Sequence, residues 1–306
     1  MVDIVIVNWN SGHFLEECVK SLSLEENAFR INKIIVVDNA SADDSLDKLP
    51  ASEKIMVIRN PTNLGFSKAC NQGFRCCQSE YVLLLNPDAR LLPDTLRESI
   101  HFMKQRTDVD IMGCQLLEDN GEIAKSCARF PTVLRMCFET IGLSKIAPGI
   151  FTPATLMTDW DHRESRLVDQ VMGAFMFMRT IIFQKNGYFD ERFFVYYEEL
   201  DFSLRLSKLN GKSYYNTAVK AIHSGQGTTI SVKAFRLFLN LKSRLQYCKK
   251  HFNPVGYAVI FFCSLVIEPF SRTLLLLVRG RLGEIKNVFK GYTMLVRSLP
   301  VNKPLN

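Results

Sequence analysis

Four short apolar runs in the first 90 residues each end in a polar loop, at residues 2–7, 34–37, 55–58 and 81–85. Continuous apolar runs bounded by turn residues are typical of strands buried on both faces. Helical spacing of apolar residues lies between them, over about 11–22 and 66–77. Strand and helix alternating in this way predict an α/β fold with a mainly parallel sheet. Because parallel strands end at the same edge of a sheet, we expect the four polar loops to form one crevice.

The fourth run leads directly into Asn86-Pro87-Asp88. Proline has no amide hydrogen and disfavours a helical residue before it, so the strand should end here. Asp88 then lies just beyond the carboxyl end of a strand, where open α/β sheets bind their ligands. A carboxylate in this position can bind a divalent cation. The alternative is an aspartate that only closes a turn.

The rest of the chain predicts further elements with less regularity. Ser11 and the 43–45 segment supply candidate helix caps. Residues 125–168 are rich in proline and polar breaks, which is typical of a lid or substrate loop. The remaining predicted elements are helices over 93–106, 198–209 and 231–251, strands over 111–116, 171–178 and 213–222, and turns at 117–122 and 186–187.

The composition indicates a globular protein, with 306 residues, 23% charged and 47% hydrophobic. Nine cysteines include no C-x-x-C pair, which favours a reducing cytosol over a disulfide framework or a zinc site. The N-terminal residues contain no positively charged segment before the apolar run, so they predict a first strand and not a secretion signal.

Positive charge is concentrated at the C-terminal end. Residues 230–306 contain 13 Lys and Arg against two Glu, a local charge of +11, which leaves −4 on residues 1–229. Two uncharged runs, 255–267 and 273–278, are each too short to span a bilayer. We expect two helices lying on an anionic membrane surface. Buried core helices or an oligomer contact are the alternatives, and no motif supports nucleic acid as a partner.

The polar motifs, taken in order, resemble those of family-2 inverting glycosyltransferases with a GT-A fold, and most closely the bacterial rhamnosyltransferase-like branch. The resemblance covers about residues 2–250. Its motifs are Asn8-Trp9-Asn10, 37–43, 63–66, 71–73, Asn86-Pro87-Asp88, Gly173-Ala174, 189–191 and 197–201.

The resemblance implies a role for each of several residues in binding the donor nucleotide. Asp38 would pair with the pyrimidine ring, where a carboxylate accepting from a ring N–H is strongly selective. Asp88 resembles the second acid of the D-x-D motif, with Asn86 in place of the first, and would bind Mg²⁺ or Mn²⁺ together with the donor phosphates. His223 would contact the metal or the diphosphate, although a lone histidine at a strand end is often only a loop residue. The nucleoside pocket would be lined by Asn8, Asn10, Gly65 and Asn71.

The resemblance also implies which residue carries the chemistry. Glu199 occupies the place of the general base, which takes the proton of the acceptor hydroxyl as it attacks the anomeric carbon. Glu198 and Asp201 would support Glu199, or would only interact favourably with the positive N-terminal end of the helix dipole. Gly173 and Ala174 would form the floor beneath the donor sugar and the acceptor, unless they are simply part of a core strand.

We therefore expect a GT-A catalytic domain over 1–229, with a nucleotide-binding half to about 110 and an acceptor half beyond it, followed by a basic helical tail over 230–306. The expected reaction is metal-dependent inverting transfer from dTDP-rhamnose or a UDP-sugar to a saccharide, with a polyprenyl-linked glycan as one option. Such an enzyme would act in bacterial surface polysaccharide or lipopolysaccharide assembly, peripherally on the cytoplasmic face of the membrane. A nucleotidyltransferase is disfavoured because residues 8–14 hold no glycine-rich basic loop. A non-catalytic membrane scaffold is disfavoured because Asp38, Asp88 and Glu199 are all present.

Overall fold

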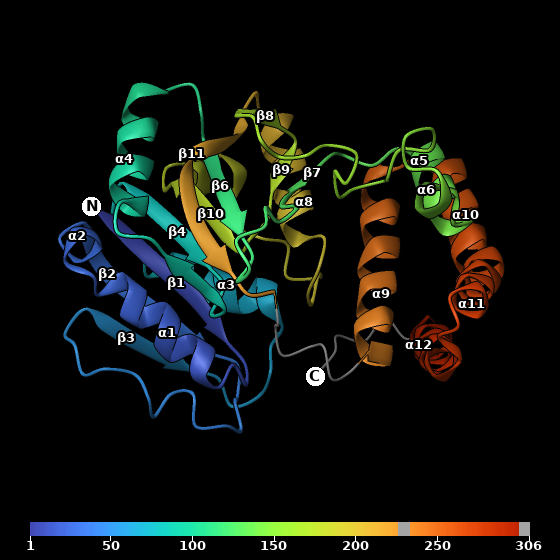
Figure 1. Ribbon diagram of the computed structural model, residues 1–306, viewed down its shortest axis with the longest axis horizontal. Helices are drawn as coiled ribbons and strands as arrows, with labels where there is room; N and C mark the ends of the chain where they lie inside the picture. The colour runs from blue at the N-terminus through green and yellow to red at the C-terminus, as the bar shows by residue number, and fades with distance from the viewer. Residues whose placement is uncertain (226–232, 300–306) are drawn as a thin grey trace.

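The computed structural model describes residues 1–225 and 233–299. Within them, a central sheet with helices on both faces adjoins a bundle of C-terminal helices (Figure 1). The strands are β1 Val2–Asn8, β2 Ile31–Asp38, β3 Ile55–Arg59, β4 Tyr81–Leu85, β5 Ala89–Leu91, β6 Ile111–Leu117, β7 Cys127–Ala128, β8 Arg166–Val168, β9 Gln170–Val171, β10 Phe175–Arg179 and β11 Ser213–His223. The helices are α1 His13–Leu22, α2 Glu25–Ala28, α3 Phe66–Arg75, α4 Thr95–Gln105, α5 Val133–Thr140, α6 Leu143–Ile146, α7 Ile182–Asn186, α8 Glu198–Ser207, α9 Lys233–His251, α10 Pro254–Phe262, α11 Glu268–Val278 and α12 Ile285–Ser298.

The central sheet has the strand order β3-β2-β1-β4-β10-β6-β11-β5, with β8 paired to β11. The first four strands are parallel, and β6 is parallel to β11. In contrast, β10 runs antiparallel between β4 and β6. The predicted α/β class with a mainly parallel sheet is confirmed.

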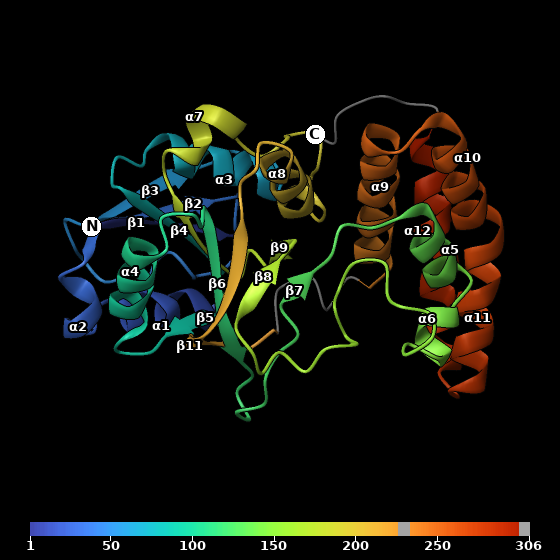
Figure 2. The same cartoon turned by 90° about the horizontal axis from the view of Figure 1, so that it is seen from above.

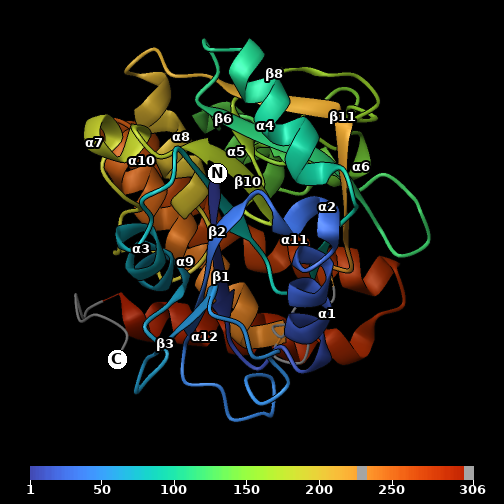
Figure 3. The same ribbon diagram turned by 90° about the vertical axis from the view of Figure 1, so that its left-hand side faces the viewer.

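The strands at the centre are apolar along their whole length because they are covered on both faces. Every residue of β1 and of β4 is buried. Helices α1 and α4 pack on one face, and α3, α7 and α8 pack on the other (Figure 3). Apolar runs that face helices on both sides need no polar alternation.

Two local predictions near the N-terminus are wrong. The N-cap of α1 is Gly12, with φ of 57°, and Ser11 instead hydrogen-bonds the side chain of Asn8. No helix follows residues 43–45, where Asp43 accepts from the backbone N–H of Gly12 and from the Ser45 hydroxyl. The polar side chains in this region fix the two loops after β1 and β2 together, which satisfies them without a helix.

The C-terminal segments also differ from the two predicted surface helices. Residues 254–278 form one continuous helical rod, in which a π-helical stretch, Cys263–Ile267, precedes Glu268 and Pro269. A π-turn is a common way for a helix to accommodate a local interruption. Residues 125–168, for which the sequence predicted no regular elements, include α5 and α6, which pack on this rod. Helix α9 lies between the rod and the sheet (Figure 2).

Candidate active site

A cavity of about 980 Å³ opens at the carboxyl ends of β1 and β4. The order in which strands are added to the sheet switches sides between these two strands. After β1, strands β2 and β3 are added on one side, whereas β4 lies on the other side of β1. Crevices at such a switch point are the usual ligand sites of open α/β sheets. Of the residues expected to form the site, the lining includes Asn86, Asp88, Ala174, Glu198 and Glu199.

The antiparallel direction of β10 explains why Gly173 and Ala174 are at this edge. Since β10 begins where β4 ends, the residues just before β10 lie beside Asn86, whose backbone N–H donates to the Ala174 carbonyl at 3.1 Å. The backbone N–H of Gly173 donates to Glu199 Oε1, also at 3.1 Å. A Cβ atom on residue 173 would lie only 2.5 Å from that oxygen, so only glycine allows this contact without a shift.

The two glutamates at the start of α8 have different surroundings. Glu199 accepts the Gly173 N–H, and burial raises the pKa of its carboxyl. Glu198 is almost completely buried, and its Oε2 has no hydrogen-bond partner among the described residues. Burial, followed by the neighbouring Glu199 charge, raises the pKa of Glu198 well above its usual value. Burial thus favours the protonated form of both carboxyl groups, and raised pKa values suit acid–base chemistry.

The backbone before these glutamates is strained. Tyr196 and Tyr197 both have φ of 70°, a left-handed conformation that costs a non-glycine residue about 1–3 kcal/mol. Helix α9 stabilises the segment, since the Ser243 hydroxyl donates to the Val195 carbonyl at 2.7 Å and the Tyr197 ring packs on Tyr247. The direction in which the acids point thus depends on a helix that follows them by about 40 residues.

Asp201 makes a second connection between α8 and α9. Its fully buried carboxylate lies 2.6 Å from Lys250 Nζ and 2.7 Å from His251 Nε2, and 2.9 Å from Arg205 Nε within α8. Although burial opposes ionisation, the hydrogen bonds from these three groups lower the pKa of Asp201. Asp201 does not line the cavity, and its ion pairs instead fix α8 against α9.

Asp88 and His223 are brought together by strand pairing. Because β5 pairs antiparallel with β11, Ala89 is opposite His223, and Asp88 Oδ1 lies 3.2 Å from His223 Nε2. That nitrogen is buried and has no well-aligned hydrogen bond within the described residues. A carboxylate and an imidazole nitrogen side by side fit a divalent cation that takes its other ligands from phosphates and water. No cluster of three or more His, Cys, Asp or Glu side chains suited to a metal occurs in residues 1–225 and 233–299.

The loops after β1 and β2 are joined by a buried polar cluster around Asp38. Asn8 Nδ2 donates to Asp38 Oδ1 at 2.8 Å, and the Ser41 N–H donates to Oδ2 at 3.2 Å. Asn10 accepts from the Ala42 N–H in the same cluster. Asp38 lies outside the cavity lining, but the next residue, Asn39, is part of it and donates to the Gly65 carbonyl.

Asn71 is one of several expected site residues that do not line the cavity, together with Asn8, Asn10, Asp38, Gly65, Gly173, Asp201 and His223. The side-chain amide of Asn71 donates to the Phe189 carbonyl at 2.9 Å and accepts from the Phe189 N–H at 3.0 Å. It therefore fixes the segment that leads to α8. Gly65 has φ of 88°, and a Cβ there would lie 2.6 Å from the Phe194 carbonyl oxygen, so its role is also close backbone packing.

Several lining residues were not among the expected site residues. Trp9, Asn63 and Phe66 lie within motifs that were recognised, so the sequence did contain a signal for them. Helix α9 carried no such signal, because its contribution depends on packing against distant segments. Its lining residues are Phe235, Arg236, Leu239 and Asn240.

Comparison with family models identifies the fold and the class of enzyme. Residues 3–153 match the model "Glycosyl transferase family 2", and residues 81–278 match "Glycosyl transferase family group 2". The chain belongs to glycosyltransferase family 2. It is thus a glycosyltransferase, and its relatives place it in the rhamnosyltransferase-like branch, as its motifs predicted.

Three relatives illustrate the similarity, and two of them are named as rhamnosyltransferases. A low-salt glycan biosynthesis hexosyltransferase, Agl10 of Haloferax volcanii, is 28% identical over 79% of this chain and 74% of its own length. An N-acetylglucosaminyl-diphospho-decaprenol L-rhamnosyltransferase of Mycobacterium tuberculosis is 24% identical over 79% of this chain and 82% of its own. The rhamnosyltransferase WbbL of Escherichia coli is 25% identical, covering 81% of this chain and 92% of its own.

Solved structures confirm the GT-A fold of this glycosyltransferase. Mannosyltransferase PcManGT from Pyrobaculum calidifontis, in complex with GDP-Man and Mn²⁺, has a TM-score of 0.54 at 12% identity, covering 98% of this chain and 86% of that chain. GalNAc-T7 with UDP, GalNAc and Mn²⁺ has a TM-score of 0.53 at 11% identity, over 94% and 58% of the two chains.

Proposed function

We propose that this glycosyltransferase moves a sugar, with inversion, from a nucleotide-sugar to a saccharide hydroxyl. One observation carries the proposal: Glu199 and Asp88 line one cavity at the switch point of the sheet, and Asp88 lies 3.2 Å from His223. A base and a group suited to the leaving diphosphate are the two requirements of a single displacement at the anomeric carbon.

Glu199 is the proposed general base. The Gly173 N–H orients the carboxylate through Oε1, and the carboxylate accepts the proton of the acceptor hydroxyl. Asp88 and His223 would hold Mg²⁺ or Mn²⁺, and the bound cation supplies neutralisation of charge on the nucleoside diphosphate. Fold neighbours solved with Mn²⁺ support the use of a divalent metal.

Asp38 is the proposed contact for the pyrimidine ring. Two hydrogen bonds from Asn8 and Ser41 occupy only part of its capacity, because a carboxylate has about four acceptor sites. A ring N–H can use a remaining site. Both dTDP-rhamnose and UDP-sugars meet this requirement, and relatives named as rhamnosyltransferases favour the former.

The substitution Glu199→Gln tests the mechanism. We expect the affinity for the nucleoside diphosphate with Mn²⁺ to stay nearly unchanged while turnover of the nucleotide-sugar falls by about two to four orders of magnitude. Full turnover in this variant would remove Glu199 from the reaction. Measuring hydrolysis of dTDP- and UDP-sugars with and without Mn²⁺ also tests the alternatives, since a scaffold hydrolyses none. A nucleotidyltransferase would instead release pyrophosphate from a nucleoside triphosphate.

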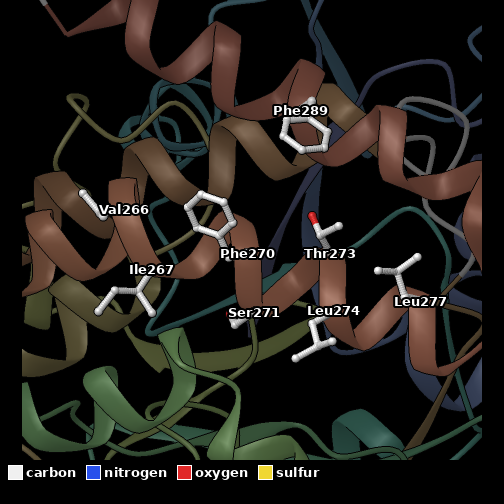
Figure 4. Close-up of a pocket in the computed structure, with 8 residues that line it drawn as sticks. All are labelled: Val266, Ile267, Phe270, Ser271, Thr273, Leu274, Leu277 and Phe289. Carbon is white, nitrogen blue, oxygen red and sulfur yellow. The ribbon is translucent and has the colours of Figure 1, made fainter.

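We also propose that the C-terminal bundle docks on an anionic membrane surface, where a lipid-linked acceptor would be available. The helix Pro254–Val278 is long and apolar enough to cross a membrane, with a mean hydropathy of 1.8, yet only 22% of its apolar window is buried. Seven of its exposed apolar residues recur every three or four positions and so form one stripe. They are Val255, Val259, Phe262, Val266, Phe270, Leu274 and Leu277, and Val278 is exposed beside the last of them. Figure 4 shows part of this stripe beside Phe289 of α12, around an apolar groove of about 580 Å³.

An orientation in the plane of the membrane fits the charges better than a spanning one. The acidic residue of the rod, Glu268, is buried on the inner face and pairs with Arg244 of α9 and with Arg272. A spanning rod would take this ion-paired network and the packed helices α9 and α12 into the bilayer, which is costly for charged groups. A rod lying in the interface leaves only its apolar stripe in lipid, and the +11 charge of residues 230–306 attracts anionic headgroups.

Vesicle flotation of the full chain tests this proposal. The double variant Phe270→Glu, Leu274→Glu should bind phosphatidylglycerol-containing vesicles at least about 100-fold more weakly, since each buried apolar side chain contributes about 1.5–3 kcal/mol. Phe29→Glu is the matched control, because Phe29 is 72% exposed and Phe270 is 73% exposed. Equal binding by all three proteins would refute the docking face, and resistance to alkaline extraction would indicate a spanning rod instead.

A further inference from the structure

The strand that brings Asp88 beside His223 is short and lies at the edge of the sheet. Strand β5 has three residues, ends the strand order and pairs with β11 (Figure 2). Short ladders at an edge open more readily than the centre of a sheet. A contact that joins β5 to β11 beyond this ladder would therefore determine how well the two side chains keep their separation of 3.2 Å.

The turn at 117–122 supplies such a contact through Asp119. Its carboxylate oxygen Oδ1 accepts from Arg90 Nη2 of β5 at 2.5 Å. The same oxygen accepts from the hydroxyl of Ser224, at the end of β11, at 3.1 Å. One carboxylate thus bridges the two strands whose pairing places Asp88 beside His223.

The register of three adjacent strands explains why Asp119 reaches both partners. Ile222 of β11 pairs with Leu117 of β6 on one side and with Arg90 of β5 on the other. Asp119 and Ser224 follow Leu117 and Ile222 by two residues each. Since β6 and β11 are parallel, both residues extend past the same edge of the sheet and meet there.

Asp119 is connected to the main chain on both sides of the proposed metal pair. Ser224 directly follows His223, and its backbone N–H donates to the Asp88 carbonyl at 3.1 Å. Arg90 comes two residues after Asp88. The Asp119 side chain itself is 45% exposed and does not line the cavity, so its contribution to the site is one of position.

Glu17 of α1 provides a natural comparison. Its Oε2 lies 2.8 Å from Nη1 of the same arginine, Arg90, and its side chain is 41% exposed. Asp119 differs in that it also hydrogen-bonds Ser224 of the neighbouring strand. Ion pairs as exposed as these contribute only about 0–1 kcal/mol to stability, so the loss of either carboxylate should leave the protein folded.

We propose that Asp119 is a positioning residue, which fixes Asp88 and His223 relative to each other and thereby sets the affinity of this site for a divalent cation. The inference rests on the proposed metal site and adds the residue that holds its two side chains in place. Groups that orient metal-binding side chains typically change metal affinity by about 10–100-fold when they are removed.

Two measurements on the full chain test this assignment: the Mn²⁺ concentration required for half-maximal UDP binding, by calorimetry, and hydrogen exchange of the backbone amides of residues 88–91 and 224 without metal. In Asp119→Ala we expect the required Mn²⁺ concentration to rise at least about tenfold and the exchange to become faster. Asp119→Asn keeps an oxygen that can accept from Arg90 and Ser224, and should lie much closer to the wild type. Glu17→Gln is the matched control and should change neither property.

Four results would overturn the assignment. Unchanged exchange in Asp119→Ala would show that the carboxylate does not hold the strands together, and faster exchange with an unchanged Mn²⁺ requirement would exclude an effect on the site. Equal losses in Asp119→Asn and Asp119→Ala would indicate an effect of charge instead of position. An equal effect of Glu17→Gln would assign the role to Arg90 alone.

Failure of the proposed metal site is distinguishable from failure of this inference. If UDP binding by the wild-type protein does not depend on Mn²⁺, the metal site is wrong. The exchange measurement, made without metal, then decides by itself whether Asp119 fixes Asp88 and His223.

Discussion

The contact between Gly173 and Glu199 allows the position of the proposed base to be changed without removing it. In Gly173→Ala, the new Cβ would lie 2.5 Å from Oε1 and 3.3 Å from Cδ of Glu199, whereas ordinary contact begins at 3.4 Å. The carboxylate must therefore retreat by about 0.9 Å, and the hydrogen bond from the residue 173 N–H lengthens from 3.1 Å. A misplacement of about 1 Å in a reacting group costs on the order of 100-fold in rate, or about 2.7 kcal/mol.

We expect kcat for nucleotide-sugar turnover to fall about 100-fold in Gly173→Ala, with little change in the affinity for the nucleoside diphosphate and Mn²⁺. The assay measures release of nucleoside diphosphate, and circular dichroism melting checks that the variant is folded. Gly149→Ala is the matched control, because a Cβ at residue 149 would meet no atom within 4 Å.

A double variant separates an effect on the base from a general disturbance. If Gly173 acts through Glu199, adding Gly173→Ala to Glu199→Gln should cause little further loss, because the two changes remove the same function. A folded Gly173→Ala enzyme with kcat within twofold of wild type would refute the reasoning, as would full additivity of the two losses.

Three further predictions follow from the buried charges around the cavity. Because the pKa of Glu198 is raised, residue 198 ionises first in the unfolded chain, and stability is lost as pH rises above the unfolded value of about 4.5. Glu198→Gln should therefore match the wild-type melting temperature near pH 4 and exceed it increasingly toward pH 8, and a constant difference would contradict a raised pKa of Glu198. Asp201→Asn should destabilise the fold by about 3–5 kcal/mol in urea unfolding, since it leaves Lys250 and His251 without their buried partner, whereas a loss below 1 kcal/mol would exclude Asp201 as the link between α8 and α9. Asp88→Asn should abolish the Mn²⁺ dependence of UDP binding measured by calorimetry, and His223→Ala should raise the Mn²⁺ concentration required by about tenfold; unchanged Mn²⁺ dependence in both would place the metal elsewhere.

Much of the sheet was determined by the sequence itself. The apolar runs of β1, β2 and β4 are long enough to be strands and have polar residues at one end, so their parallel arrangement and the crevice followed from local pattern alone. The same pattern placed Asp88 after a strand. Its neighbour His223 is 135 residues away, and their approach depends on the antiparallel pairing of β5 with β11.

Only the tertiary structure decided how the C-terminal helices relate to the site. Sequence pattern separated a tail from residues 1–229, because charge and hydropathy are local properties and the change near residue 230 is sharp. Packing instead makes α9 a wall of the cavity, fixes the strained Tyr197 before the glutamates, and pairs Asp201 with His251. Likewise, Asn71 hydrogen-bonds Phe189, 118 residues further along, which no spacing rule predicts. Periodicity reports which face of an element is buried, whereas the partner that buries it is selected by the packing of the whole chain.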